Sequence, residues 1–597
     1  MPHDDVTKLP AVPEVETPSA TDVGEGSSTA PSSKLEDRQR PSQATLAAPA
    51  LPEGCSYGTL TKASSDGKEA AGETVIWVEF APGSRENPFF FSKWRKVSIT
   101  ACATFFTFMT AYTTTAYSIS EESMCRDLHC TNLQFASGIA LYAWGFGIAP
   151  LMLAPLSEEF GRKWTYATAC FLFFILHLMM TLAKNMATVL VARFIIGCAG
   201  SVGATLVGGT ISDIFIPAHR GLPMALFGFC AVFGTGFGAV TMAWVEVEPH
   251  LGWRWIQWIQ FIILGAFFPV CLVVMRETRA TVILRRRAAK LRKERGLADG
   301  GRYLARAEID KVKFVTAMGQ SMTRPLVFLA TEPIVTFFSL WIALGWGVFY
   351  TQIAGIPYTY RRLHGFGTTG VGLIYLCICI GASLGFAGNF IQEKIYRKRA
   401  AKRGVEARLY APMLCGILFA VGCYINGFTS ISSVHWIAPC VGLTIVLAAV
   451  TLIYVTAFTY LSECYGMYAS SAIAGQSFAR NMMGGAFSLI TSPMFKRLTV
   501  RWSLVMMGGF ATLLAAVPFV AFVWGPQIRA RSRYSRMLMA AEREQLEKER
   551  AARTGRGMDP TATEDLEGDA NERDEGELGA DEANALHLVP SCAEKIV

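Results

Sequence analysis

The most distinctive chemistry in the sequence lies in a charged turn, residues 153–166, which reads LAPLSEEFGRKWTY. Two adjacent acids beginning at Glu158 stand close to two bases, Arg162 and Lys163, with Gly161 between them. Glycine permits a tight chain reversal, and such charges can form ion pairs that exist in one conformation and break in another. The turn is therefore a candidate conformational latch. The alternative is a solvated surface turn whose bases only set membrane topology.

The elements that position this turn are apolar. The runs 135–153 and 166–182 flank it, and each is long enough to cross ~30 Å of hydrocarbon as a helix at ~1.5 Å per residue. Backbone groups in lipid must be satisfied within their own segment, so such runs are helices. Twelve apolar stretches are expected to span the membrane: 98–118, 134–154, 165–183, 187–210, 222–244, 256–275, 327–350, 369–391, 409–428, 434–461, 470–492 and 502–524.

The predicted fold class is therefore all-α integral membrane, with twelve transmembrane helices in two six-helix halves that suggest an internal duplication. Polar composition predicts disorder at both ends, because such segments cannot bury a core. The expected parts are a disordered N-terminal tail (1–95), a first half (96–275), a basic linker (276–326), a second half (327–525) and a C-terminal tail (526–597) that is acidic and disordered at its end.

Charge asymmetry predicts the orientation. Residues 276–326 carry fourteen Lys and Arg against five acids, and residues 392–408 carry seven against two. The positive-inside rule places both segments, both termini and the 153–166 turn in the cytoplasm. Within the linker, 280–295 reads as a basic helix, which either lies on anionic lipid or only sets topology.

Several functional classes are excluded by what the sequence lacks. It has no GxxxxGK[ST] nucleotide loop, no Cys and His cluster with zinc spacing and no hydrolase arrangement. We therefore expect no enzyme activity, no cofactor, no metal and no nucleic-acid partner. Cys125 and Cys130 share one short loop, and the sequence leaves open whether they pair.

Motifs along the chain resemble one family. The 153–166 turn is similar to the signature between helices two and three of the major facilitator superfamily, specifically its fungal drug:proton antiporter branch with twelve spans. Further similar motifs, in chain order, are Arg193–Gly197, Gly208–Asp213, Gly252–Trp255, Arg276–Thr278, Glu332–Pro333, Glu406–Leu409, His435–Trp436, Tyr468–Ala472, Arg480 and Gly525–Arg529. The resemblance implies the major facilitator fold and a secondary transporter that exports drugs, metabolites or polyamines. In that family the turn stabilises the outward-facing state, which here implies a latch between the halves made by Glu158, Gly161, Arg162, Lys163 and Asp213.

The fifth helix departs from the antiporter pattern. Gly234 and Gly238 remain and permit close helix packing, but Thr235 and Ala239 stand where the family has prolines. Without those prolines more of the backbone hydrogen-bond ladder stays intact, which puts the usual antiport gate in question.

Ionisable residues inside the spans are few, and each is a functional hypothesis because intramembrane charge is costly. Arg193 is either a coupling or substrate residue or a structural donor to backbone carbonyls, Arg480 leans toward structure, and His177 is expected to be a packing residue. No acid falls in the middle of a span, so proton coupling would run through acids near span ends, such as Asp213, Glu332 and Glu463. The hydroxyls and rings that could meet a substrate belong to Thr113, Tyr117, Trp346, Tyr350 and Tyr454.

The sequence thus predicts a monomeric exporter, embedded in membrane lipid, of a small amphipathic drug or secondary metabolite, or of a glycolipid, by proton antiport. A polycation would need cavity carboxylates to offset its desolvation, so polyamines are disfavoured as substrates. Two alternatives stay open: a proton-independent facilitator or importer of a metabolite, and a non-transporting membrane sensor with a transporter fold.

Overall fold

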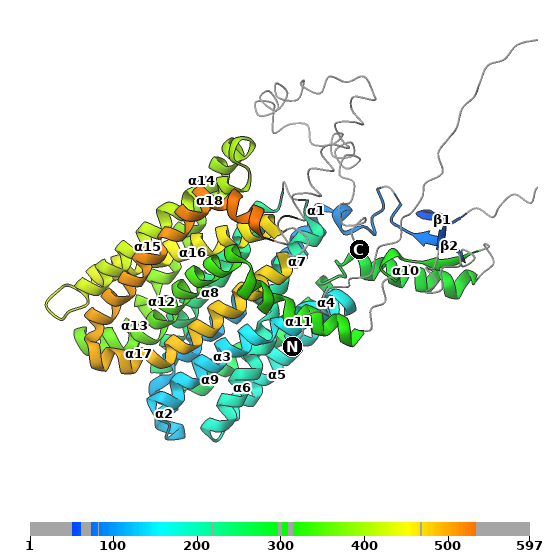
Figure 1. Ribbon diagram of the computed structural model, residues 1–597. Helices are drawn as coiled ribbons and strands as arrows, with labels where there is room; N and C mark the ends of the chain where they lie inside the picture. Colours follow the sequence, from blue (N-terminus) through cyan, green and yellow to red (C-terminus); the bar gives the residue numbers. More distant parts are fainter. Residues whose placement is uncertain are drawn as a thin grey trace, which may run out of the picture. The chain divides into compact units, whose positions relative to one another are not determined.

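The computed structural model describes residues 51–60, 73–81, 83–216, 219–296, 301–308, 314–465, 469–532 and 536. They fall into two compact units. The larger unit holds the helical bundle, and the smaller one is built from residues before 83 and from 284–309. The helices of the larger unit are long and run side by side (Figure 1).

The first half of the bundle runs from α1 to α9. Its helices are α1 (Lys93–Ile119), α2 (Glu121–Leu128), α3 (Asn132–Ile148), α4 (Pro150–Phe160), α5 (Arg162–Thr181), α6 (Met186–Gly200), α7 (Val202–Ile214), α8 (Gly221–Val247) and α9 (Gly252–Val274), preceded by the short 3-10 helix η1 (Pro88–Phe90).

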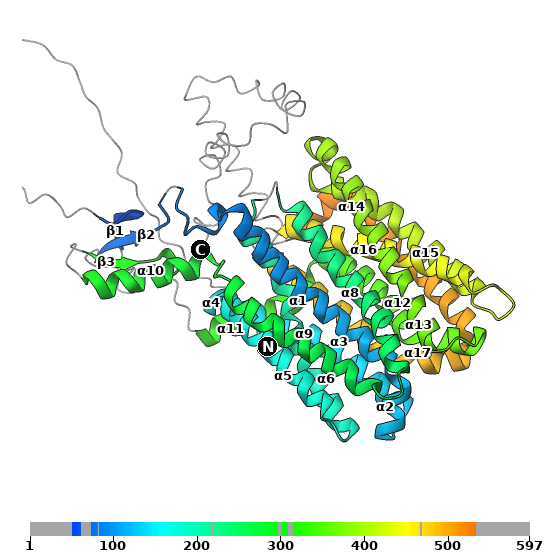
Figure 2. The ribbon, with the colours of Figure 1, turned by 180° about the vertical axis from the view of Figure 1, so that it is seen from behind.

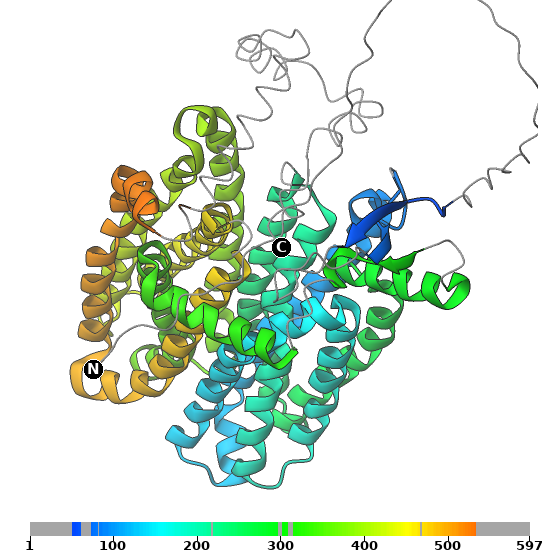
Figure 3. The ribbon, with the colours of Figure 1, turned by 45° about the vertical axis from the view of Figure 1, so that its right-hand side comes forward.

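The second half follows the same plan. Its helices are α11 (Phe314–Thr331), α12 (Pro333–His364), α13 (Thr368–Ile374), α14 (Leu376–Arg403), the 3-10 helix η4 (Gly404–Leu409), α15 (Tyr410–Thr429), α16 (Ile437–Tyr465), α17 (Ala469–Leu514) and α18 (Ala516–Arg531). Helix α17 contains two of the expected stretches and is broken at Thr499, whose φ is 65°. Seen obliquely, the blue-to-green helices of the first half gather on one side and the green-to-orange helices of the second half on the other (Figure 3).

Among the described residues, nine helices are long and apolar enough to cross a membrane, or ten if the bent pair α3 and α4 forms one span. Each of the twelve expected stretches lies mostly on helix, so the arrangement is consistent with twelve spans. Helix α1 is not among these nine although it is 27 residues long, because its many threonines lower its mean hydropathy. These hydroxyls bond within the helix: Thr104, for example, donates to the Thr100 carbonyl at 2.8 Å.

The charged turn is much shorter than its sequence suggested. We expected a surface loop over 153–166, but α4 continues to Phe160 and α5 begins at Arg162. Only Gly161 is non-helical, with φ 100°. The charged side chains at this junction have ion-pair partners elsewhere in the chain: Arg162 pairs with Asp213, and Glu158 approaches Arg279. The linker also differs from expectation, because its last part forms α11.

The smaller unit corrects the prediction that residues 1–95 are wholly disordered. Strand β1 (Cys55–Leu60) pairs antiparallel with β2 (Glu73–Val78), and β2 pairs parallel with β3 (Arg302–Leu304) from the linker. Helix α10 (Ala280–Arg295) has the predicted bounds, and its Ala288 is buried with Ile76 and Tyr303 in a small core. The pairing joins strands more than 200 residues apart, so local composition could not reveal it. Within the predicted tails, residues 1–50, 61–72, 82, 533–535 and 537–597 lie outside the described residues.

An ion pair also stabilises this smaller unit. Arg292 on α10 donates to both carboxylate oxygens of Glu308 at 2.8 Å, and to the Tyr303 carbonyl at 2.8 Å. The hydrogen bonds to Glu308 raise the pKa of Arg292. The basic helix therefore uses one face within a folded unit, which the sequence did not indicate.

The two halves of the bundle meet through close helix packing. Helix α3 packs on α17, and α8 packs on α13 and α14; Figure 2 shows α8 next to α14 from behind. At the end of the bundle that carries Arg162, the Phe458 ring comes within 2.7 Å of the position that a Cβ on Gly208 would take. At the opposite end, Arg361 donates to Glu122 at 3.1 Å. The halves therefore touch at both ends.

Candidate functional site

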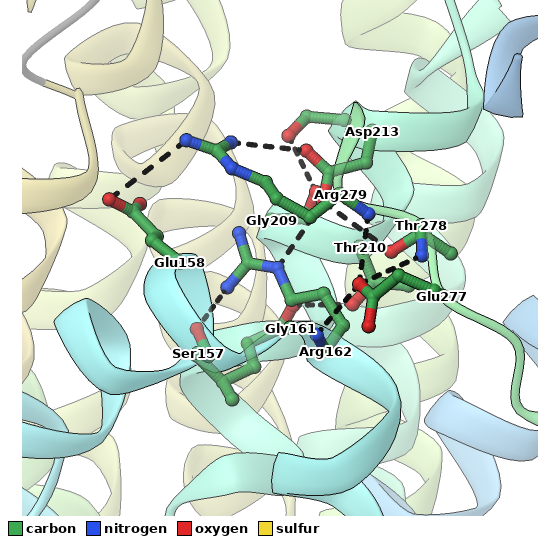
Figure 4. A network of polar contacts seen from close by, with 12 residues as sticks. Ser157, Glu158, Gly161, Arg162, Gly209, Thr210, Asp213, Glu277, Thr278 and Arg279 are labelled. Atoms are coloured by element: carbon green, nitrogen blue, oxygen red, sulfur yellow. Dashed lines mark hydrogen bonds and ion pairs between the residues drawn. The ribbon is translucent and has the colours of Figure 1, made fainter. Parts of the chain in front are cut away.

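A polar network surrounds Arg162, which is 4% exposed (Figure 4). Its Nε donates to Asp213 at the end of α7 at 3.2 Å, and its Nη1 donates to Ser157 on α4 at 2.6 Å. Its backbone N–H donates to Glu277, just after α9, at 2.9 Å. One arginine thus connects α4, α5, α7 and the residues that follow α9.

The glycines at this network have no room for a side chain. A Cβ on Gly161 would lie 2.0 Å from the Glu277 carboxylate, and a Cβ on Gly209 would lie 2.6 Å from Nη2 of Arg162. Gly161 is also at positive φ, where other residues are strained. The predicted need for glycine in a tight reversal is therefore confirmed, with close approach to an acid as a second reason.

Three details of the latch prediction need correction. Glu158 approaches Arg279 at 3.9 Å, whereas the sequence suggested a pair with Arg162. Lys163 lies beside the Trp164 ring, and in the described part of the chain it forms no ion pair. Every member of the network belongs to the first half or to the start of the linker, so the network does not bridge the halves. Its link to the second half is indirect, because α4 packs against α11 and α17.

The second half has a corresponding cluster, which the sequence analysis missed. Arg408, just before α15, pairs with Glu463 near the end of α16 at 2.6 Å and with Glu393 on α14 at 3.2 Å. Arg529 pairs with Glu406. The motifs containing Glu406 and Arg529 were recognised as similar to the family, but the residues carried no assigned role. Arg408 resembles Arg162 in its place in the fold, because it also joins several helices of its own half through ion pairs. Its position beside α15 and α16 shows this, whereas the local sequence does not.

Two arginines are buried in the interior of the bundle. Arg193 on α6 is 0% exposed and donates to the carbonyls of Gly138 at 3.1 Å and Thr113 at 3.4 Å. These are the bonds expected of a structural arginine, which is one of the two roles that the sequence left open for Arg193. Arg480 on α17 is 3% exposed, and its one side-chain hydrogen bond goes to Ser477 at 3.3 Å.

The predicted aromatic residues gather at these arginines. Tyr117 and Tyr142 flank Arg193, while Trp346 and Tyr454 flank Arg480. Sequence reasoning missed Tyr142. Thr113 was predicted to offer its hydroxyl to a substrate. In the structure this hydroxyl donates to Gln260 on α9 at 2.7 Å, inside the first half.

The predicted acids near span ends differ in their partners. Asp213 and Glu463 both pair with arginines. Glu332, 3% exposed at the start of α12, accepts from the hydroxyls of Tyr465 at 3.1 Å and of Ser532, and no base pairs with it among the described residues. His177 is fully buried and donates from Nδ1 to the Phe173 carbonyl at 2.6 Å, as a packing residue would.

Two remaining predictions concern packing and pairing. A Cβ on Gly238 would lie 2.4 Å from the Tyr112 carbonyl of α1, so this glycine does permit close packing of α8 on α1. The structure joins Cys125 and Cys130 in a disulfide, which resolves the alternative that the sequence left open.

A bundle of two similar helical halves, with charged clusters at one end and buried arginines inside, has the architecture of a membrane transporter. The family model of the Major Facilitator Superfamily matches residues 100–489. The chain therefore belongs to the Major Facilitator Superfamily, as its motifs indicated, and is a multi-pass membrane transporter.

Known relatives are fungal. The chain is 30% identical over 467 residues to the ascochitine biosynthesis cluster MFS transporter of Didymella fabae, covering 77% of this chain and 89% of the relative. It is 29% identical to the MFS-type efflux pump MFS2 of Trichophyton rubrum (79% and 78% covered), and 28% identical to the major facilitator superfamily multidrug transporter FLU1 of Candida albicans (76% and 75% covered). Among solved structures, the proton:xylose symporter XylE matches with a TM-score of 0.54 at 17% identity, over 73% of this chain and 96% of that one. That likeness shows the fold.

Proposed function

We propose that this transporter exports a small amphipathic compound, a drug or secondary metabolite that is neutral or anionic, across the plasma membrane by alternating access. Its termini and linker lie in the cytoplasm, and it works as a monomer. The observation that carries the proposal is the bundle interior, where Arg193 and Arg480 are buried among aromatic rings and, within the described residues, without a paired acid. The relatives named as efflux pumps support the direction of transport.

We further propose that transport is coupled to protons through Glu332. A proton carrier must be able to lose its charge, and an acid held by an arginine resists protonation. Asp213 and Glu463 are held in this way, whereas Glu332 is bonded to hydroxyl groups.

One observation favours a proton-independent facilitator as a second candidate. Helix α8 runs without a break from Gly221 to Val247, and Thr235 donates to the Ala231 carbonyl at 3.1 Å within it. The fifth span is thus a regular helix where antiporters of the family have a proline-bearing gate.

The first experiment identifies the cargo and measures its flux. Metabolites in medium and cells are compared with and without the gene, and the cargo found is then assayed in membrane vesicles. Export that a protonophore abolishes supports antiport, and export insensitive to it supports the facilitator. Spermidine should not compete; strong competition would overturn the proposed neutral or anionic substrate.

A deletion distinguishes the transporter from a sensor. A chain lacking residues 1–85 and 540–597 should keep its cargo flux if the bundle alone transports. Loss of a cellular response without any measurable flux in the full chain would favour the sensor.

A further inference from the structure

Each half of the bundle holds one buried arginine that lacks an anionic partner. Arg193 is 0% exposed and Arg480 is 3% exposed, and no carboxylate within the described part of the chain bonds to either. Buried charges are normally paired, because removal from water is costly and must be offset by an opposite charge. Two unpaired cations in one bundle therefore point to an anion that is not part of the chain.

Both guanidinium groups have N–H donors that bond to no acceptor among the described residues. Nη2 of Arg193 and both Nε and Nη1 of Arg480 are buried and have no acceptor among the described residues. The remaining donors of Arg193 are fixed on carbonyls, which orients the group. Guanidinium donors match the oxygens of a carboxylate in geometry as well as charge.

Aromatic rings hold each arginine on either side. The Arg193 guanidinium lies 4.2 Å from the Tyr117 ring centre and 4.3 Å from that of Tyr142. The Arg480 guanidinium lies 4.9 Å from Trp346 and 4.7 Å from Tyr454. Ring faces stabilise a cation without neutralising it, so the charge remains available to a ligand.

Tyr350 connects the two arginines. It follows Trp346 by one turn of α12, and its ring lies 2.8 Å from the position of a Cβ on Gly484, one turn after Arg480 on α17. The Arg193 site meets the same stretch of α17, because Trp144, two residues after Tyr142 on α3, donates to the Met482 carbonyl at 3.2 Å. The two cations therefore converge on the same region between the halves.

We propose that Arg193 and Arg480 together bind the carboxylate of an amphipathic organic acid, whose apolar ring packs against the surrounding aromatic side chains. This deepens the proposed export function by naming a substrate class: aromatic or similarly apolar monocarboxylates. One arginine comes from each half, so the anion contacts both halves at once.

The test compares three probes of one shape on the purified full chain in nanodiscs. They are 1-naphthoate, its neutral amide 1-naphthamide, and the cation 1-naphthylmethylamine. We expect naphthoate at millimolar concentration to raise the melting temperature and to bind at least ~10-fold more tightly than the amide, and the amine not to bind. Equal binding of acid and amide, or no stabilisation by naphthoate, would overturn the proposal.

Variants assign the preference to the site. Arg480→Gln should remove the preference for acid over amide, and Arg480→Lys should keep part of it through the retained charge. Arg501→Gln is the matched control: it lies on α17 beyond the break at Thr499 and also lies over two rings, Phe428 and Trp502. An unchanged preference in Arg480→Gln would refute the assignment. If that variant is not monodisperse, the wild-type preference and the partial preference of Arg480→Lys decide.

The outcome is separable from that of the export proposal. Binding in nanodiscs requires no transport, so acid-selective binding without flux in vesicles would leave the site standing and reject export. Transport of another cargo without acid-selective binding would support export and reject the carboxylate site.

Discussion

Replacing Arg162 by alanine should remove most transport while leaving the protein in the membrane. The substitution deletes the hydrogen bonds to Asp213 at 3.2 Å and to Ser157 at 2.6 Å. Hydrogen bonds to charged groups contribute about 1.5–3 kcal/mol each. Asp213 keeps Arg279 at 3.5 Å and Ser157 can bond to water, so we discount the sum by half, to about 1.5–3 kcal/mol.

That free energy has a measurable consequence. Because the network lies within the first half, losing about 1.5–3 kcal/mol raises the population of locally opened forms of that half by roughly 10–150-fold. The assay is the initial rate of cargo flux in vesicles at equal amounts of protein, with the melting temperature measured alongside. Arg162→Lys should be intermediate, because one ammonium group replaces a fork that reaches two partners.

Lys163→Ala is the matched control for this experiment. It removes the same charge from the adjacent position, but Lys163 contacts only the Trp164 ring among the partners described for it. If the turn acts through topology alone, both alanine variants should behave alike. Full flux in Arg162→Ala, or an equal loss in the two variants, would refute the structural role of the network.

Four further predictions use other parts of the chain. Gly300→Cys, at a linker position outside the described residues, is introduced into a variant of the protein that has no other cysteine. In intact cells this cysteine should not react with an impermeant thiol reagent; a reaction would place the linker on the extracellular side. Glu332→Gln should leave cargo binding intact while abolishing pH-dependent flux, and retained pH dependence would move coupling elsewhere. Gly238→Ala should lower the melting temperature, at a cost of about 1–3 kcal/mol for overpacking against α1, while Gly509→Ala, with no atom within 4 Å of the added Cβ, should not. Tyr303→Asp should make the linker sensitive to trypsin by opening the small core in which Tyr303 is fully buried, and an unchanged digestion rate would mean the sheet is not needed.

Most of the fold could be predicted because the bilayer imposes a length and a composition on every span. The stretch 222–244, for instance, corresponds to α8 within three residues at each end. Predictions failed where contacts between distant segments decide the structure. The strand at 73–78 pairs with residues 55–60 and also with residues 302–304, and no local feature of the tail signals that second, distant partner.

The candidate sites show the same division. Arg193 and Arg480 were found because charge inside an apolar run is conspicuous. The role of Arg408 was missed because it lies in a loop crowded with other bases, and only the folded chain brings it to Glu463. Tyr142 was missed for a similar reason, since one tyrosine among many apolar residues is usually a packing residue.

The placement of the charged clusters suggests how the transporter moves. Arg162 fastens helices of the first half together, and Arg408 does the same in the second half, through bonds made within each half. At that end of the bundle the contact between halves is apolar, as between Gly208 and Phe458. Apolar surfaces in a bundle can separate without breaking ion pairs, so each half can rotate as a rigid body while its own network stays intact. The network then holds α4 in the position in which it packs against α17. Without Arg162 the first half would be less rigid, and its rotation would no longer move the buried arginines.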